Sequence, residues 1–205
     1  MEFLLRGPGA HQPARVGVLP GAFNPPTVAH LAMAEAALAH VDEVVFVLPE
    51  IFPHKIYEGA SLKARAQMLR ASIAAEARFS VAVAKGGLFR EIAAEFRDSY
   101  GPRARLSFLC GRDAAERILN WDYGSETFVA EMLGEFDLLV ARRRGEMDAP
   151  LHARHAIERL DLSDDLDLVS STEVRERIAR GADWRHLVPQ TIHEMAALIY
   201  SRDQK

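Results

Sequence analysis

Short apolar runs alternate along the chain with longer segments in which apolar residues recur at helical spacing. The runs contain few charged residues, which is typical of strands that are buried on both faces of a sheet. They predict strands at residues 16–19, 44–48, 79–84, 106–110, 137–141 and 166–169. The other segments predict a helix that starts at residue 28 and further helices at residues 61–77, 88–100, 114–119, 127–133, 151–160, 171–180 and 189–200.

This alternation of strands and helices predicts an α/β fold. We expect a Rossmann-like, doubly wound parallel sheet of about five to six strands with helices on both faces. In such sheets, ligands bind beyond the carboxyl ends of the strands. The loops at residues 21–30, 49–55, 111–113 and 142–145 follow predicted strands, so we expect them on one edge of the sheet.

The chain has 205 residues, which is enough for one well-buried core. It contains no repeat, low-complexity linker or change of composition, so we expect a single domain at residues 15–205. Residues 1–14 contain only a short apolar run and include Glu2. We therefore expect a loose N-terminal tail there and not a signal peptide. No apolar stretch is long enough to span a bilayer.

Net charge and cysteine content limit the possible binding partners and the cellular compartment. The net charge of −4 gives no indication of nucleic-acid or membrane binding, so we expect neither partner. An anionic substrate would need a local cluster of basic residues. The single cysteine, Cys110, excludes an intramolecular disulfide and is typical of the cytoplasm, where we expect the protein. It ends a predicted buried strand, which favours a core residue over a nucleophile.

The segment at residues 16–30, VGVLPGAFNPPTVAH, combines a strand, a tight loop and the start of a helix. Gly21, Pro25 and Pro26 end the strand pattern and predict the loop. The free N–H groups at the start of a helix can bind phosphate, and His30 would lie in the first helical turn. The alternative is a loop in which the prolines only determine shape and His30 is a surface residue.

A second segment, VSSTEVR at residues 169–175, also leads from a predicted strand end into a helix. Hydroxyl groups and free N–H groups at a helix start can accept a phosphate, and Arg175 adds a permanent positive charge. The alternative is ordinary helix capping by Ser171 or Thr172 with Arg175 in solvent. The chain contains neither GxGxxG nor GxxxxGK[ST], so the two common glycine-rich nucleotide motifs are absent.

Both segments resemble signatures of the nucleotidyltransferases. GAFNPPTVAH is similar to the (H/T)xGH loop, with Thr27 and His30 at its polar positions and Ala29 where the family usually has glycine. VSSTEVR resembles the second motif, (I/V)SSTx(I/V)R. The two motifs occur in the expected order, with alternating strands and helices between them.

Further motifs resemble the nicotinate/nicotinamide mononucleotide adenylyltransferases in particular, and the resemblance extends over about residues 16–200. PHK stands at residues 53–55, and LVARRxG at residues 139–145 is similar to a strand that ends in RRxG. The run FxxGxD...W is matched by Phe108, Gly111, Asp113 and Trp121.

The resemblance implies roles for individual residues of this chain. It implies catalytic roles for His30, Lys55 and Arg175. It implies ATP or phosphate contacts from Gly21, Ala22, Phe23, Thr27, His30, Arg142, Ser170, Ser171, Thr172 and Arg175. It implies contacts with the mononucleotide from Asn24, Lys55, Gly87, Asp113 and Trp121. By their types alone, Lys55 could be a solvated loop residue, Asp113 a helix cap and Trp121 a core residue.

The run at residues 85–89, KGGLF, departs from the family pattern. Members that prefer nicotinate usually carry a polar GxSYT-like run here, and Phe89 stands where a threonine is expected. The choice between nicotinate and nicotinamide mononucleotide therefore stays open.

The resemblance implies an enzyme of NAD biosynthesis that moves AMP from ATP to the phosphate of nicotinate or nicotinamide mononucleotide. The products would be a dinucleotide and pyrophosphate. Mg²⁺ would be bound through the ATP phosphates and not by a metal site of the protein. The alternatives are cytidylyl transfer, phosphopantetheine adenylyl transfer, and a nucleotide-binding regulator without catalysis. The sequence leaves the oligomeric state open.

Overall fold

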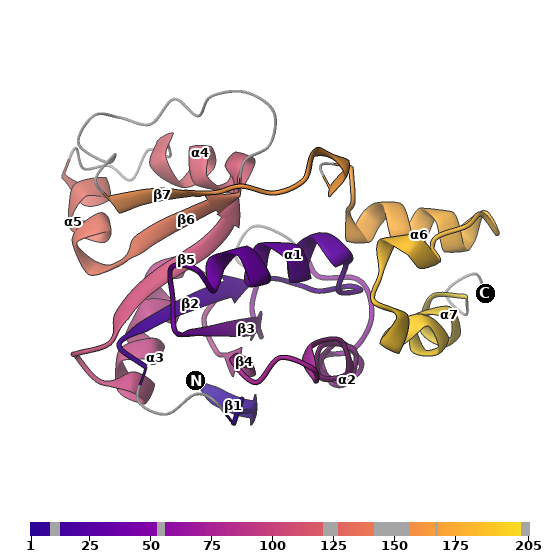
Figure 1. Ribbon diagram of the computed structural model, residues 1–205, viewed down its shortest axis with the longest axis horizontal. Coiled ribbons are helices and arrows are strands. Elements are labelled where there is room, and N and C mark those ends of the chain that lie inside the picture. Colours follow the sequence, from indigo (N-terminus) through magenta and orange to yellow (C-terminus); the bar gives the residue numbers. More distant parts are fainter. Residues whose placement is uncertain (9–12, 53–55, 121–126, 142–155, 167, 202–205) are drawn as a thin grey trace.

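The computed structural model describes residues 1–8, 13–52, 56–120, 127–141, 156–166 and 168–201. These residues form a seven-stranded sheet in the order β1-β4-β3-β2-β5-β6-β7 (Figure 1). The strands are β1 (Glu2–Leu5), β2 (Arg15–Pro20), β3 (Glu43–Pro49), β4 (Phe79–Ala84), β5 (Arg105–Gly111), β6 (Asp137–Ala141) and β7 (Ile157–Leu160). The α-helices are α1 (Val28–Ala37), α2 (Leu62–Ile73), α3 (Phe89–Tyr100), α4 (Arg112–Asn120), α5 (Phe128–Glu135), α6 (Ser171–Ala179) and α7 (His193–Tyr200). Short 3₁₀ helices are η2 (Asp164–Leu166), η3 (Arg185–Leu187) and η4 (Gln190–Ile192).

The predicted α/β fold is confirmed. Every neighbouring pair of strands from β4 across to β7 is parallel. Side chains of β3 alternate between the two faces, as a period of two requires. Val45 and Val47 pack with the core that α3, α4 and α5 cover. Val44 and Phe46 pack with the core beneath α1 and α2. Helices therefore cover both faces of the sheet.

The C-terminal helices build a third core beside the sheet. Val174 of α6 and Tyr200 of α7 pack in one cluster with Met68 of α2. In Figure 1, α6 and α7 lie on the side toward which β2 and β3 run. The fold thus brings the C-terminal part of the chain to the carboxyl ends of the first parallel strands.

The expectation of a loose tail over residues 1–14 is wrong for residues 2–5. These residues form β1, which pairs antiparallel with β4 at the edge of the sheet. Phe3 packs edge-on against Tyr100, with ring centroids 5.8 Å apart. Pairing with an open sheet edge and partial burial of an aromatic side chain both favour order. This antiparallel strand, together with β7, raises the sheet from the expected five or six strands to seven.

Two predictions near the C-terminal half are also wrong. Residues 157–160, which were expected to end a helix, form β7 and pair with β6; residues 151–155 lie outside the described part. The expected strand at residues 166–169 is absent from the described residues of that stretch, where η2 ends at Leu166. The expected final helix starts as η4 and becomes α-helical at His193. In the described part of the chain, no helix has the length and apolar character needed to cross a membrane.

Candidate active site

The loop at residues 21–26, called here the proline loop, leads from β2 to α1 at the carboxyl edge of the sheet. The Gly21 N–H donates to the carbonyl oxygen of Val47 at 3.0 Å, which ties the loop to β3. Phe23 has a φ of +47°, a conformation that non-glycine residues adopt rarely. Its ring is only 1% exposed and packs on Phe46, with centroids 5.7 Å apart. Burial of this ring holds the unusual backbone turn in place.

Thr27 and His30 cap the start of α1 reciprocally. The Thr27 side chain accepts from the His30 N–H at 3.4 Å, and the Thr27 N–H donates to His30 Nδ1 at 3.0 Å. The Thr27 hydroxyl lies 2.7 Å from the same Nδ1. Because Nδ1 accepts a backbone hydrogen bond, the neutral ring carries its proton on Nε2. The sequence places two site residues three positions apart, and this capping box fixes their geometry.

The His30 ring is neutral in this site at pH 7. Burial lowers its pKa from 6.5 to about 4, because a buried imidazolium loses hydration. Phe23 contacts the ring edge-on, with centroids 5.0 Å apart. His30 therefore offers an uncharged Nε2–H donor.

Helix α6 joins the same site across 146 positions of sequence. The Ser171 hydroxyl donates to the Pro25 carbonyl oxygen at 2.7 Å. Arg175 donates from Nη1 to the Asn24 carbonyl oxygen at 2.6 Å and from Nη2 to Thr172 Oγ1 at 3.2 Å. Ser170 caps α6 by accepting from the Glu173 N–H at 3.1 Å. The two motif segments thus meet, and part of the second motif holds the first in shape.

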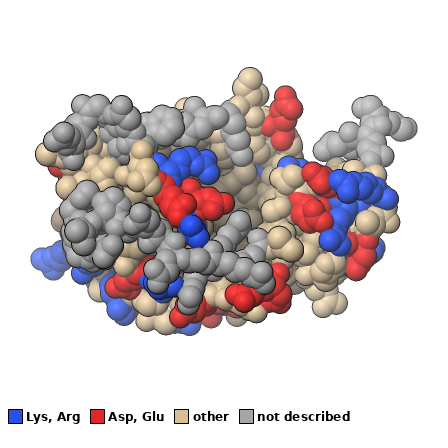
Figure 2. Space-filling view, turned by 90° about the horizontal axis from the view of Figure 1, so that it is seen from above, with Lys and Arg blue, Asp and Glu red and all other residues tan. Residues whose placement is uncertain are grey.

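A pocket of about 310 Å³ lies where the proline loop, α1 and α6 meet. It is lined by Ala22, Phe23, Asn24, His30, Ile56, Tyr57, Glu58, Ser171, Thr172 and Arg175. A larger pocket, of about 530 Å³, lies between β1 and α2. The larger pocket contains none of the predicted site residues, so the smaller one is the candidate active site. On the face shown in Figure 2, the described Lys and Arg side chains lie next to Asp and Glu and form no extended basic surface.

The Asn24 side chain is committed to the protein itself. It is 4% exposed, and its Oδ1 accepts from the Ala60 N–H at 3.1 Å and from the Tyr200 hydroxyl at 2.7 Å. These bonds connect the proline loop with the segment before α2 and with α7. Both lone pairs of Oδ1 are therefore engaged within the protein. The expected contact between Asn24 and the mononucleotide would have to use another atom of Asn24.

The remaining predicted residues are placed apart from this pocket or outside the described residues. The Gly87 N–H donates to Glu91 Oε2 at 2.9 Å, and the Leu88 N–H donates to the same oxygen at 3.0 Å. Asp113 is exposed and lies inside the first turn of α4, not at the capping position before it. Lys55, Trp121 and Arg142 lie outside the described residues.

The sequence analysis did not identify three polar residues whose hydrogen bonds support the segments that line the pocket. Arg65 of α2 donates to the carbonyl oxygens of Ala22 and Ala60, at 2.9 and 3.1 Å. The Tyr57 hydroxyl donates to the Ala60 carbonyl oxygen at 2.9 Å, and Tyr200 bonds Asn24. Only Arg65 had a signal in the sequence. It lies three residues after Leu62 and four before Leu69, on the apolar face of its helix, where a charge needs a buried partner.

Comparisons with known proteins agree with the two motifs. The sequence model of the family described as cytidylyltransferase-like matches residues 18–177. A protein of Moorella thermoacetica named "Probable nicotinate-nucleotide adenylyltransferase" is 30% identical over 200 residues, which cover 89% of each chain. A protein of the same name from Exiguobacterium sibiricum is 31% identical over 189 residues, covering 88% of this chain and 95% of its own.

Solved structures show the same fold. Plasmodium falciparum nicotinic acid mononucleotide adenylyltransferase complexed with NaAD superposes with a TM-score of 0.68 at 14% identity, covering 90% of this chain and 93% of its own. The same protein complexed with APC also gives a TM-score of 0.68, covering 91% of this chain and 94% of its own. The family match, the relatives and the meeting of the two motif segments in one pocket lead to one conclusion: the chain belongs to the cytidylyltransferase-like family of nucleotidyltransferases, together with the proteins named nicotinate-nucleotide adenylyltransferases.

Proposed function

We propose that the protein transfers AMP from ATP to the phosphate of a pyridine mononucleotide, nicotinate or nicotinamide mononucleotide, and releases pyrophosphate. The observation that carries this proposal is that His30 of the first motif and Arg175 of the second line the same pocket. The names of the curated relatives support the same acceptor class.

The reaction needs positioning and charge stabilisation more than a covalent intermediate. An oxygen of the acceptor phosphate attacks the α-phosphorus, and the bond from that phosphorus to the bridging oxygen of pyrophosphate breaks. Holding the two reactants in line can supply roughly 7–11 kcal/mol. His30 Nε2–H donates to the α-phosphoryl oxygens as their charge grows, and a preorganised donor of this kind is worth about 2.7–4 kcal/mol.

The phosphates are assigned to the start of α6 and to the proline loop. Arg175, Ser171 and Thr172 line the pocket with positive charge and hydroxyl groups. A permanently charged guanidinium and free N–H groups at a helix start suit phosphate. We include Ser170, Thr27, Gly21, Ala22 and Phe23 in the ATP-binding set. Mg²⁺ enters as part of the nucleotide substrate, coordinated by its phosphate oxygens.

The acceptor is assigned to the neighbouring loops. Asp113 lies in the first turn of α4, directly after β5, whose partner β2 leads into the proline loop, so both lie at the same edge of the sheet. Lys55, Trp121 and Arg142 are retained in the proposal on the strength of the motifs alone. Asn24 and Gly87 are also retained on the strength of the motifs alone, since Asn24 Oδ1 and the Gly87 N–H already bond within the protein. A single domain, whose sheet includes β1, and the cytoplasmic location also stand as proposals.

The test is pyrophosphate release by the full chain with Mg²⁺ and ATP. Nicotinate mononucleotide, nicotinamide mononucleotide and phosphopantetheine are offered separately, and CTP replaces ATP in parallel reactions. We expect release with ATP and at least one of the pyridine mononucleotides. Release only with CTP or only with phosphopantetheine would assign another reaction of the family, and ATP binding without any release would favour a regulator.

A further inference from the structure

Arg65 is a buried cation that lies behind the pocket. Arg65 is only 3% exposed, and an arginine is rarely buried without a specific partner. Nη1 donates to the carbonyl oxygen of Ala22 in the proline loop at 2.9 Å. Nε donates to the carbonyl oxygen of Ala60, the residue two positions before α2, at 3.1 Å. One guanidinium therefore holds two chain segments that are 38 residues apart.

The same guanidinium also holds an aromatic pair. It lies 4.4 Å from the ring centroid of Tyr57 and 5.7 Å from that of Phe52. The two rings are stacked, with centroids 4.9 Å apart and planes inclined by 18°. A cation over a ring face is attracted by its quadrupole, and more strongly so when it is desolvated. The Tyr57 hydroxyl bonds the Ala60 carbonyl oxygen, which Arg65 also bonds.

Both segments that Arg65 holds line the candidate active site. Ala22 and Phe23 line it from the proline loop, and Tyr57 and Glu58 line it from the segment before α2. The Ala60 N–H also donates to Asn24 Oδ1, so the two segments are joined by a direct bond as well as through Arg65. Rigid supports of this kind set the distance between reacting groups, and an error of about 1 Å can cost about a hundredfold in rate.

We propose that Arg65 is a positioning residue of the transfer reaction: it fixes the proline loop against residues 57–60, and so sets the width of the pocket that receives the nucleotide. The expected effect on kcat rests on the proposed function. The expected effect on the position of the proline loop does not depend on which ligand the pocket binds.

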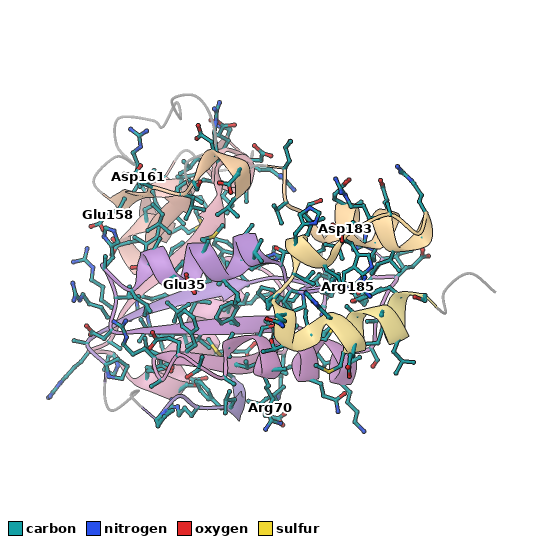
Figure 3. All side chains as sticks on the ribbon, turned by 45° about the vertical axis from the view of Figure 1, so that its right-hand side comes forward. Glu35, Arg70, Glu158, Asp161, Asp183 and Arg185 are labelled. Carbon is teal, nitrogen blue, oxygen red and sulfur yellow. The ribbon has the colours of Figure 1, made fainter. Side chains whose placement is uncertain are left out.

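The test compares three variants of the full chain. Arg65→Met keeps the length of the side chain and removes all donors, and Arg65→Lys keeps the charge but cannot hold both carbonyl oxygens in a fork. Arg70→Met is the matched control, because Arg70 is an exposed residue of the same helix and is labelled in Figure 3 at the outer surface. The measurements are kcat and KM for ATP and hydrogen exchange of the Gly21 and Ala60 amides. Both amides donate hydrogen bonds that should loosen without Arg65.

We expect kcat of Arg65→Met to fall by at least about tenfold, with KM for ATP changed less than about threefold. Arg65→Lys should lie between Arg65→Met and the wild type, and Arg70→Met should match the wild type within about twofold. Exchange of the Gly21 and Ala60 amides should accelerate by at least about tenfold in Arg65→Met and not in Arg70→Met. If Arg65→Met does not fold, Arg65→Lys carries the same test, with kcat lowered at least about threefold and faster exchange at both amides.

Folded Arg65 variants with wild-type kcat and wild-type exchange at both amides would overturn the proposal. A lowered melting temperature with unchanged kcat per folded molecule would also overturn it, because the role would then be structural only. If the wild type itself releases no pyrophosphate with either pyridine mononucleotide, the proposed function fails. The exchange measurement still decides on Arg65 in that case.

Discussion

His30 takes its properties from the turn in which it stands. The Thr27 N–H holds Nδ1 at 3.0 Å, and burial lowers the ring's pKa to about 4. A neutral donor with a fixed tautomer costs little reorganisation when charge grows on a phosphoryl group. Without the neighbouring capping residue, the same histidine would rotate more freely.

Replacement of His30 by alanine should lower kcat by at least about a hundredfold. The variant loses the Nε2–H donor, while α1 keeps its Thr27 cap. Steady-state pyrophosphate release measures the effect. His40→Ala is the control, because His40 is a partly exposed residue that pairs with Glu158 at 2.8 Å, away from the residues that line the pocket. Near-normal turnover of His30→Ala would remove His30 from the mechanism.

The lowered pKa of His30 also predicts how stability depends on pH. The unfolded chain binds this proton at a pKa of 6.5 and the folded chain only near 4, so unfolding takes up a proton between these values. The contribution of His30 to stability is therefore fully present above about pH 6.5 and falls as the pH drops toward 4, by roughly 3 kcal/mol in total. Denaturant unfolding of the wild type and of His30→Gln at pH 7 and pH 4.5 measures this difference. An equal loss of stability in both proteins would contradict it.

At the N-terminus of α3, carboxylates of the helix itself accept the hydrogen bonds of the preceding N–H groups. Glu91 in the first turn accepts from the N–H groups of Gly87 and Leu88, at 2.9 and 3.0 Å. Glu95 accepts from the Gly86 N–H at 3.0 Å. A carboxylate of the protein thus occupies donors that would otherwise suit a carboxylate of a ligand, and its charge repels one.

We expect Glu91→Ala to raise the ratio of kcat/KM for nicotinate mononucleotide over nicotinamide mononucleotide by about threefold or more. The substitution frees two N–H groups and removes a negative charge from this helix start. Parallel assays with the two mononucleotides give the ratio. Glu35→Ala removes the same charge from an exposed position of α1 and should leave the ratio unchanged (Figure 3). A ratio that stays constant in Glu91→Ala would place this loop outside the acceptor site.

The central strands could be predicted from sequence because their signal is local. The apolar run at residues 44–48 is buried on both faces, and the observed strand, β3, is longer than the prediction by only one residue at each end. β7 was missed because it is an edge strand in which Glu158 and Arg159 are exposed and only Leu160 is buried. Charged residues on an edge strand prevent further pairing, and they also obscure the alternation that predicts a strand. β1 was missed because its order depends on pairing with β4, some 80 positions away.

The same distinction applies to the site. Thr27, His30, Ser171 and Arg175 could be predicted because each motif is contiguous and its residue types suit phosphate; the structure brings the two motif segments together. Arg65, Tyr57 and Tyr200 were missed because their partners are backbone or buried atoms of remote segments, as in the bond from Tyr200 to Asn24 across 176 positions. Such contacts depend on the finished fold and have no short motif.

Three parts of the fold meet at the carboxyl edge of the sheet. Parallel strands lead into the proline loop, α2 supports it through Arg65, and α6 lines the pocket with Ser171, Thr172 and Arg175. Helices α6 and α7 lie beyond the carboxyl ends of β2 and β3 (Figure 1). Each of the three parts is hydrogen-bonded to the loop: β3 through the Val47 carbonyl oxygen to Gly21, α2 through Arg65 to Ala22, and α6 through Arg175 and Ser171 to Asn24 and Pro25. The shape of the pocket is therefore a property of the complete chain and not of the two motifs alone.

The central claim is that this pocket transfers an adenylyl group, and labelled ATP tests it most directly. The full chain is incubated with Mg²⁺, the better pyridine mononucleotide, and ATP labelled at either the α- or the γ-phosphorus. Label from the α-position should appear in a dinucleotide, and label from the γ-position should appear in pyrophosphate. Transfer of the γ-label to the mononucleotide, or recovery of the α-label as free AMP alone, would contradict adenylyl transfer.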